Sequence, residues 1–161
     1  MSSSPFIRWT GLAAIFAGVF NAAGAILDAN PPGYIGIIYL GATVTTLAAI
    51  AGFYQYQKDG AGIWGLAGVL AILIGNLFFF SESTVALGSS VLGLGLLLLA
   101  VGSFKAGKFP RWVPVLWVLS MLVGLPGFLY PDLRETLFIL GAVTFAVGFA
   151  GAGYTMWSRS G

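Results

Sequence analysis

Six long stretches without a charged residue run through the chain, and they constrain its fold more than any other feature. Each is about 20 residues or longer, the length that an α-helix needs to cross a hydrocarbon core of about 30 Å. None alternates apolar with polar residues, so the pattern argues against a transmembrane β-barrel, the other fold that satisfies backbone groups in lipid. The stretches are residues 9–27, 34–57, 60–81, 83–104, 112–131 and 136–158.

We therefore expect an all-α fold, a polytopic membrane bundle of six transmembrane helices arranged as three antiparallel hairpins. The composition agrees, because 58% of the residues are hydrophobic and 7% are charged, whereas a soluble domain carries about 25% charged residues. Short loops pair consecutive helices, and turns are expected at residues 30–33, 58–60 and 130–132. Residues 1–161 form one integral membrane domain, with helices at about 7–27, 34–57, 61–80, 84–104, 111–130 and 133–157.

The charged residues between these stretches alternate in sign along the chain. With six crossings, six of the seven basic residues share one face, and four of the five acids lie on the other face with Arg134. An excess of Lys and Arg in short loops marks the cytoplasmic side, so we expect a multi-pass cell-membrane (inner or plasma membrane) protein with both termini in the cytoplasm. The six basic residues are Arg8, Lys58, Lys105, Lys108, Arg111 and Arg159.

The first apolar stretch has one alternative interpretation. Arg8, the apolar run and the small triplet at residues 23–25 resemble a signal peptide with its cleavage site. The run is long for that role, so we expect it to remain as the first membrane helix.

Small residues recur at four-residue spacing in three of the expected helices. In lipid, such stripes let helix backbones approach closely, so they are typical of helix–helix interfaces. The stripes are Ala14, Gly18 and Ala22; Gly41, Thr45 and Ala49; and Thr144, Gly148 and Ala152.

The three expected hairpins share a sequence pattern. Each opens with a Trp (Trp9, Trp64, Trp112), and the second helix of each carries a Leu-Gly pair at residues 40–41, 92–93 and 140–141. Coincidence in a Leu/Gly-rich chain is the alternative to a true repeat. On the segments 111–112, 124–131 and 140–148 with their earlier counterparts, the chain resembles the HdeD-type acid-resistance membrane proteins. That resemblance implies three short hairpin repeats, and it carries over no catalytic or binding residue to this sequence.

The absence of certain residue types excludes several kinds of chemistry. The chain has no Cys and no His, which removes disulfides, Cys/His zinc sites, His-ligated haem and the commonest general base. We expect no metal and no cofactor, although a chlorophyll-type pigment with an Asn, Glu or water ligand stays open. We also expect no nucleic-acid partner, since the basic residues are the ordinary topology signals of loops.

Polar residues near one membrane face define the candidate site. In a functional interpretation, they would line a small pocket open to the outside. In a structural interpretation, the Asn side chains would form an interhelical hydrogen bond and the charged residues would be solvated loop residues. We favour the structural interpretation. The pocket residues are Asn21, Asp28, Asn76, Glu82, Asp132, Arg134 and Glu135. Pro126 is a candidate helix break, which would free backbone carbonyls to bind a ligand. Alternatively, Pro126 only kinks the helix.

These features favour a small membrane protein without catalytic chemistry, an accessory, scaffold or stress-related protein that acts by packing. The alternative is a small oligomeric transporter or channel for a neutral or small solute, lined by hydroxyls such as Thr43, Thr45, Thr46, Ser120 and Thr144. An intramembrane enzyme ranks last, because no nucleophile–base pair is evident. The expected partners are the lipid bilayer and either further copies of the chain or a larger membrane complex.

Overall fold

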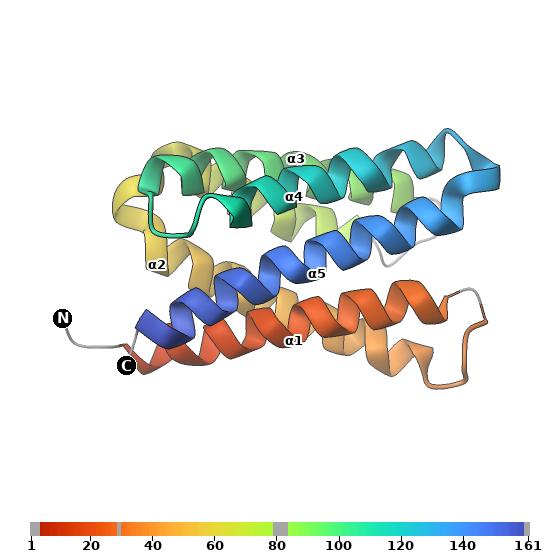
Figure 1. Cartoon of the computed structure of the whole chain (residues 1–161), viewed down its shortest axis with the longest axis horizontal. Helices are drawn as coiled ribbons and strands as arrows, with labels where there is room; N and C mark the ends of the chain where they lie inside the picture. Colours follow the sequence, from red (N-terminus) through yellow and green to blue (C-terminus); the bar gives the residue numbers. More distant parts are fainter. Residues whose placement is uncertain (1–3, 29, 79–83, 160–161) are drawn as a thin grey trace.

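The computed structural model of the chain describes residues 4–28, 30–78 and 84–159 (Figure 1). Every secondary-structure element in these ranges is helical, which confirms the all-α prediction. The elements are α1 (Pro5–Leu27), α2 (Ile35–Leu77), α3 (Val85–Ala106), α4 (Trp112–Gly124), the 3₁₀ helices η3 (Leu125–Phe128) and η4 (Pro131–Leu133), and α5 (Arg134–Arg159).

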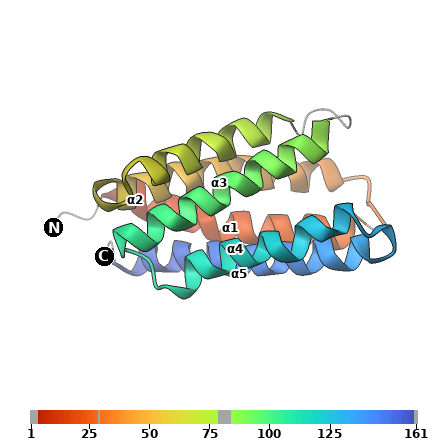
Figure 2. The same cartoon turned by 90° about the horizontal axis from the view of Figure 1, so that it is seen from above.

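Helix α2 contains both the second and the third helix expected from the sequence. Its 43 residues would extend about 65 Å if straight, about twice the thickness of a hydrocarbon core. The helix is interrupted at Gly62, whose φ of 56° and ψ of −151° lie outside the helical region and are open to glycine without steric cost. Figure 2 shows that α2 folds back there, so we refer to residues 35–61 as its first segment and 63–77 as its second.

The helices pack as antiparallel neighbours through glycine. A Cβ at Gly41 of α2 would lie 3.2 Å from the Phe20 ring of α1, so the first segment packs on α1. A Cβ at Gly75 would lie 2.7 Å from the Leu92 backbone nitrogen, so the second segment packs on α3. Helix α5 packs between α1 and α4, and α4 contacts α3 much less extensively than it contacts α5.

Four helical stretches are long and apolar enough to cross a membrane, among the residues that the structure describes. They are Pro5–Leu27, Ile35–Leu77, Ala86–Ala106 and Pro131–Arg159; Trp112–Phe128 is apolar but shorter. By length and composition, these helices fit a membrane protein.

Aromatic side chains fill the centre of the bundle. Phe53 of α2, Trp117 of α4 and Phe149 of α5 are fully buried. The Phe53 ring lies 5.3 Å from the Trp117 ring and 5.1 Å from the Phe149 ring, measured between centroids. Phe109, in the loop after α3, closes this cluster at one end, with its ring 5.6 Å from that of Phe53.

The two termini lie at the same end of the bundle (Figure 1). The guanidinium carbon of Arg8 is 4.1 Å from the centroid of the Trp157 ring, and Arg159 Nη1 donates a hydrogen bond to the Lys108 carbonyl at 3.2 Å. Lys105 Nζ lies 5.3 Å from the centroid of the Trp64 ring, a contact between the last turn of α3 and the second segment of α2. We call this the basic end, and it holds Arg8, Lys58, Lys105, Lys108, Arg111 and Arg159.

We expect Gly18→Ala to destabilise the bundle and Gly36→Ala to leave it unchanged or slightly more stable. A Cβ at Gly18 would lie 2.7 Å from the Ala146 carbonyl oxygen on α5, whereas a Cβ at Gly36 would meet nothing within 4 Å. Overpacking of this kind costs about 1–3 kcal/mol, while Ala favours a helix by up to about 1 kcal/mol over Gly. Thermal unfolding of both purified variants in detergent measures the difference. Equal melting temperatures would contradict the α1–α5 contact.

Candidate functional site

Asn21, a member of the predicted pocket set, makes a hydrogen bond that links two helices. Its Nδ2 donates to the Ala17 carbonyl of its own helix at 2.8 Å and to Thr46 Oγ1 of α2 at 3.2 Å. Thr46 is buried, at 6% exposure. The Asn21 amide therefore fastens α1 to the first segment of α2.

Asn76 occupies the corresponding position in the second hairpin but bonds differently. Its Nδ2 donates to the Ile72 carbonyl, one turn earlier in the same helix, at 2.8 Å. Among the described residues, no hydrogen bond connects Asn76 to Asn21. The two amides of the predicted pocket belong to different helix pairs.

The charged members of the predicted pocket lie on separate elements of the fold. Asp28 Oδ1, just after α1, accepts a hydrogen bond from the Tyr39 hydroxyl at 2.9 Å. Asp132 lies in η4, and Arg134 and Glu135 begin α5, where the Arg134 guanidinium carbon is 5.4 Å from the Phe138 ring centroid. Glu82 lies outside the described residues.

The chain around Pro126 leaves the α-helical conformation and re-forms its hydrogen bonds locally. Helix α4 ends at Gly124, and Pro126 lies in η3. The Pro126 carbonyl accepts hydrogen bonds from the backbone N–H groups of Leu129 at 2.9 Å and Tyr130 at 3.0 Å. This carbonyl is therefore already engaged by the turn that follows it.

Most hydroxyls in the middle of the helices are bonded to their own backbone. Thr45 Oγ1 donates to the Gly41 carbonyl at 2.6 Å, and Thr144 Oγ1 donates to the Leu140 carbonyl at 2.7 Å. Ser120 is buried and donates to the Trp117 carbonyl at 2.8 Å. Such bonds are made inside each helix, so they need no polar neighbour across the bundle.

Sequence reasoning missed a buried polar pair near the basic end. Ser103 Oγ of α3 donates to Gln57 Oε1 of α2 at 2.8 Å, and Gln57 is fully buried. Gln57 Nε2 has no hydrogen-bond partner among the residues that the structure describes. Gln57 stands at the boundary of an apolar stretch, where a polar residue looks interfacial; its position one turn after the buried Phe53 is the signal that places it inside.

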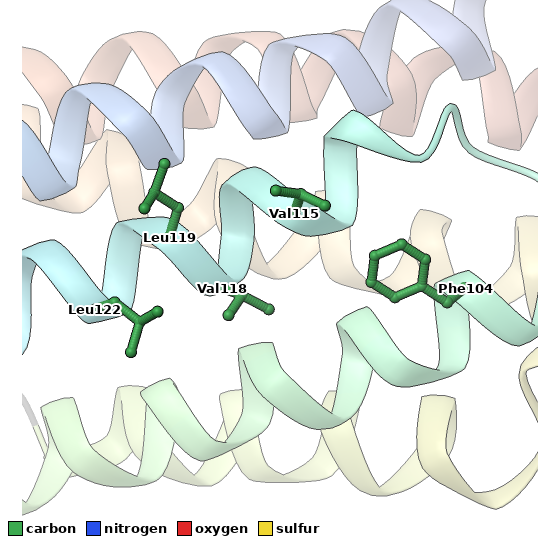
Figure 3. Close-up of a pocket in the computed structure, with 5 residues that line it drawn as sticks. All are labelled: Phe104, Val115, Val118, Leu119 and Leu122. Atoms are coloured by element: carbon green, nitrogen blue, oxygen red, sulfur yellow. The ribbon is translucent and has the colours of Figure 1, made fainter.

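A second missed feature is an apolar groove between α3 and α4 (Figure 3). It has a volume of about 260 Å³. Phe104 extends from α3 towards α4, and the rest of the lining comes from α4. The lining residues are Phe104, Val115, Val118, Leu119 and Leu122.

No protein-family model, curated protein or solved structure matches the chain. The resemblance to the HdeD-type proteins therefore stays a prediction. The geometry of the chain itself carries the functional argument.

Asn21→Leu should lower the stability of the bundle, whereas Asn76→Leu should not. Interhelical hydrogen bonds in membrane proteins are worth on the order of 1 kcal/mol. Of the two Asn side chains, Asn21 alone bonds a side chain of another helix among the described residues. Thermal unfolding in detergent compares the variants. The double variant Asn21→Leu with Thr46→Val should lose less stability than the sum of the losses in the two single variants. If the two losses simply add, the Asn21–Thr46 hydrogen bond does not contribute to stability.

Ser103→Ala should destabilise the protein, and Gln57→Leu added to it should restore much of the loss. Removing Ser103 Oγ leaves the buried Gln57 amide without a partner, at a cost of about 1–3 kcal/mol, whereas replacing both partners by apolar groups is nearly neutral. Ser90→Ala is the matched control, because Ser90 Oγ bonds only the Ala86 carbonyl of its own helix. Thermal unfolding midpoints in detergent compare the stability of these variants. A double variant no more stable than Ser103→Ala would show that the unpaired Gln57 amide is not the cause of the loss.

Proposed function

We propose that all six apolar segments of this chain cross a cell membrane, with the basic end in the cytoplasm. The two segments of α2 are then two separate membrane crossings, and α4 together with η3 forms one further crossing. Two observations support this proposal. Helix α2 reverses direction at Gly62, and Arg8, Lys105 and Arg159 lie at the same end of the bundle. The positive-inside rule gives the orientation.

The outward side chains of the helices support a lipid environment. Ile37 and Ile63 of α2 are 72% and 75% exposed, and Leu129 after η3 is 76% exposed. Burying such a side chain away from water is worth about 1.5–3 kcal/mol, so several of them on different helices favour a hydrocarbon environment. A soluble protein rarely exposes apolar surface continuously.

We propose further that the protein acts by packing, as an accessory, scaffold or stress-related membrane protein without catalytic chemistry. The observation that carries this proposal is the filled centre of the bundle, where Phe53, Trp117 and Phe149 have no exposed surface. The Thr and Ser bonds to their own helices are the second support, because they leave few polar groups facing the interior. The stress-related part rests on the resemblance to the HdeD-type proteins.

Native mass spectrometry of the protein, extracted gently from its own membrane, tests this function. We expect the chain to leave the membrane bound to other polypeptides, whose identity would name the complex that it supports. A homo-oligomer that retains a small solute and carries no other polypeptide would contradict the scaffold proposal and favour the oligomeric transporter.

A further inference from the structure

We propose that the groove between α3 and α4 is a binding site for one anionic phospholipid, with an acyl chain in the groove and the headgroup on the basic loop that joins the two helices. This inference rests on the proposed membrane insertion of the chain.

The groove has the chemistry that an acyl chain needs. Its lining is wholly apolar, and it opens sideways on the bundle, where Val115 and Leu119 of α4 are 48% and 43% exposed. Helices α3 and α4 are joined by a short loop but pack loosely against each other, which leaves the space between them. In a bilayer this space meets hydrocarbon directly, so a lipid chain enters without crossing a polar barrier.

One end of the groove meets the greatest concentration of positive charge in the chain. Phe104 in the lining precedes Lys105 directly, and Val115 follows Arg111 by one helical turn. Lys105, Lys108 and Arg111 are exposed, and the stretch from 105 to 111 contains no acid. An anionic phospholipid matches both parts of this surface, because its acyl chain fits the apolar groove and its headgroup is attracted to the basic residues.

Aromatic side chains and a hydrogen bond from α5 also position the loop between α3 and α4 at the headgroup level of the membrane. Trp64 and Trp112, 42% and 48% exposed, lie at the basic end, where amphipathic rings mark the headgroup level of a membrane. Arg159 of α5 donates to the Lys108 carbonyl at 3.2 Å and adds a further cation beside the loop. Lipid phosphates at this level would lie at the same end of the bundle as the exposed Lys105 and Lys108.

A second copy of this chain is a poorer occupant of the groove. All copies in one membrane share an orientation, so a neighbour would bring its own basic end to the same level. The like charges of two basic loops would then repel at the mouth of the groove. An anionic lipid gains from the same charges.

The test is native mass spectrometry of the full-length protein in detergent, titrated with dioleoyl phosphatidylglycerol or with dioleoyl phosphatidylcholine. We expect the wild type to bind the anionic lipid at least about tenfold more tightly. Lys105→Gln with Lys108→Gln should reduce that preference by about tenfold. Arg8→Gln with Lys58→Gln is the matched control, because it removes two charges of the same end and one cation–aromatic contact, and it should keep the preference.

The groove itself is tested by filling it. Val115→Trp should weaken binding of phosphatidylglycerol about tenfold, whereas Val44→Trp, at an exposed position of α2 outside the groove, should not. In the wild type, phosphatidylglycerol with a photoreactive acyl chain should crosslink to Phe104 and to α4, a result that needs no variant. Equal affinity for the two lipids, crosslinks elsewhere, or a wild-type dimer that Val115→Trp converts to a monomer would each overturn the proposal.

These outcomes are separable from a failure of membrane insertion. Carbonate-washed membranes should retain the wild-type chain. A chain released by carbonate would refute the proposed function, whereas a retained chain that does not distinguish the two lipids would refute the lipid site alone.

Discussion

Close contact between helix backbones at glycine is the interaction on which the rest of the structure depends. A Cβ at Gly11 would lie 2.8 Å from the Gly153 carbonyl oxygen, and one at Gly141 would lie 3.0 Å from both the Ser120 oxygen and the Gly124 Cα. In lipid the hydrophobic effect does not drive helices together, so packing at short range has to supply the association energy. These contacts bring α5 against both α1 and α4, and Trp117 of α4 and Phe149 of α5 fill the centre together with Phe53 of α2. The basic end and the groove are consequences of that arrangement.

Much of this architecture is predictable from the sequence, because lipid leaves a chain few options. Helices follow from the need to satisfy backbone groups internally, and the apolar stretches give their approximate positions. The small-residue stripes also predict interfaces correctly. Gly18 faces Ala146, Gly41 faces Phe20, and Gly148 faces the Trp117 ring. The Asn21 amide makes a hydrogen bond of the interhelical kind that the favoured interpretation describes, to Thr46 of α2.

Other features depend on contacts between distant segments, which hydropathy does not encode. The expected turn at residues 58–60 is helical, and the reversal occurs at Gly62, because a single positive-φ glycine redirects the chain without a loop. The pairing of Gln57 with Ser103 depends on which faces of α2 and α3 meet, and local sequence does not specify that. The groove arises because α4 packs on α5 in preference to α3. Whether the polar residues from Asn21 to Glu135 form a site, and whether the three hairpins are a true repeat, stay predictions.

Topology mapping by single cysteines tests the central claim, that α2 crosses the membrane twice and returns the basic end to one side. The chain has no native Cys, so each introduced thiol reports alone. An impermeant maleimide applied to intact cells should label Asn30→Cys and Asp132→Cys. It should label Asp59→Cys and Lys108→Cys only after permeabilisation. Labelling of Asp59→Cys in intact cells, or in neither condition, would contradict the account, because residue 59 would then lie outside the cell or within the bilayer.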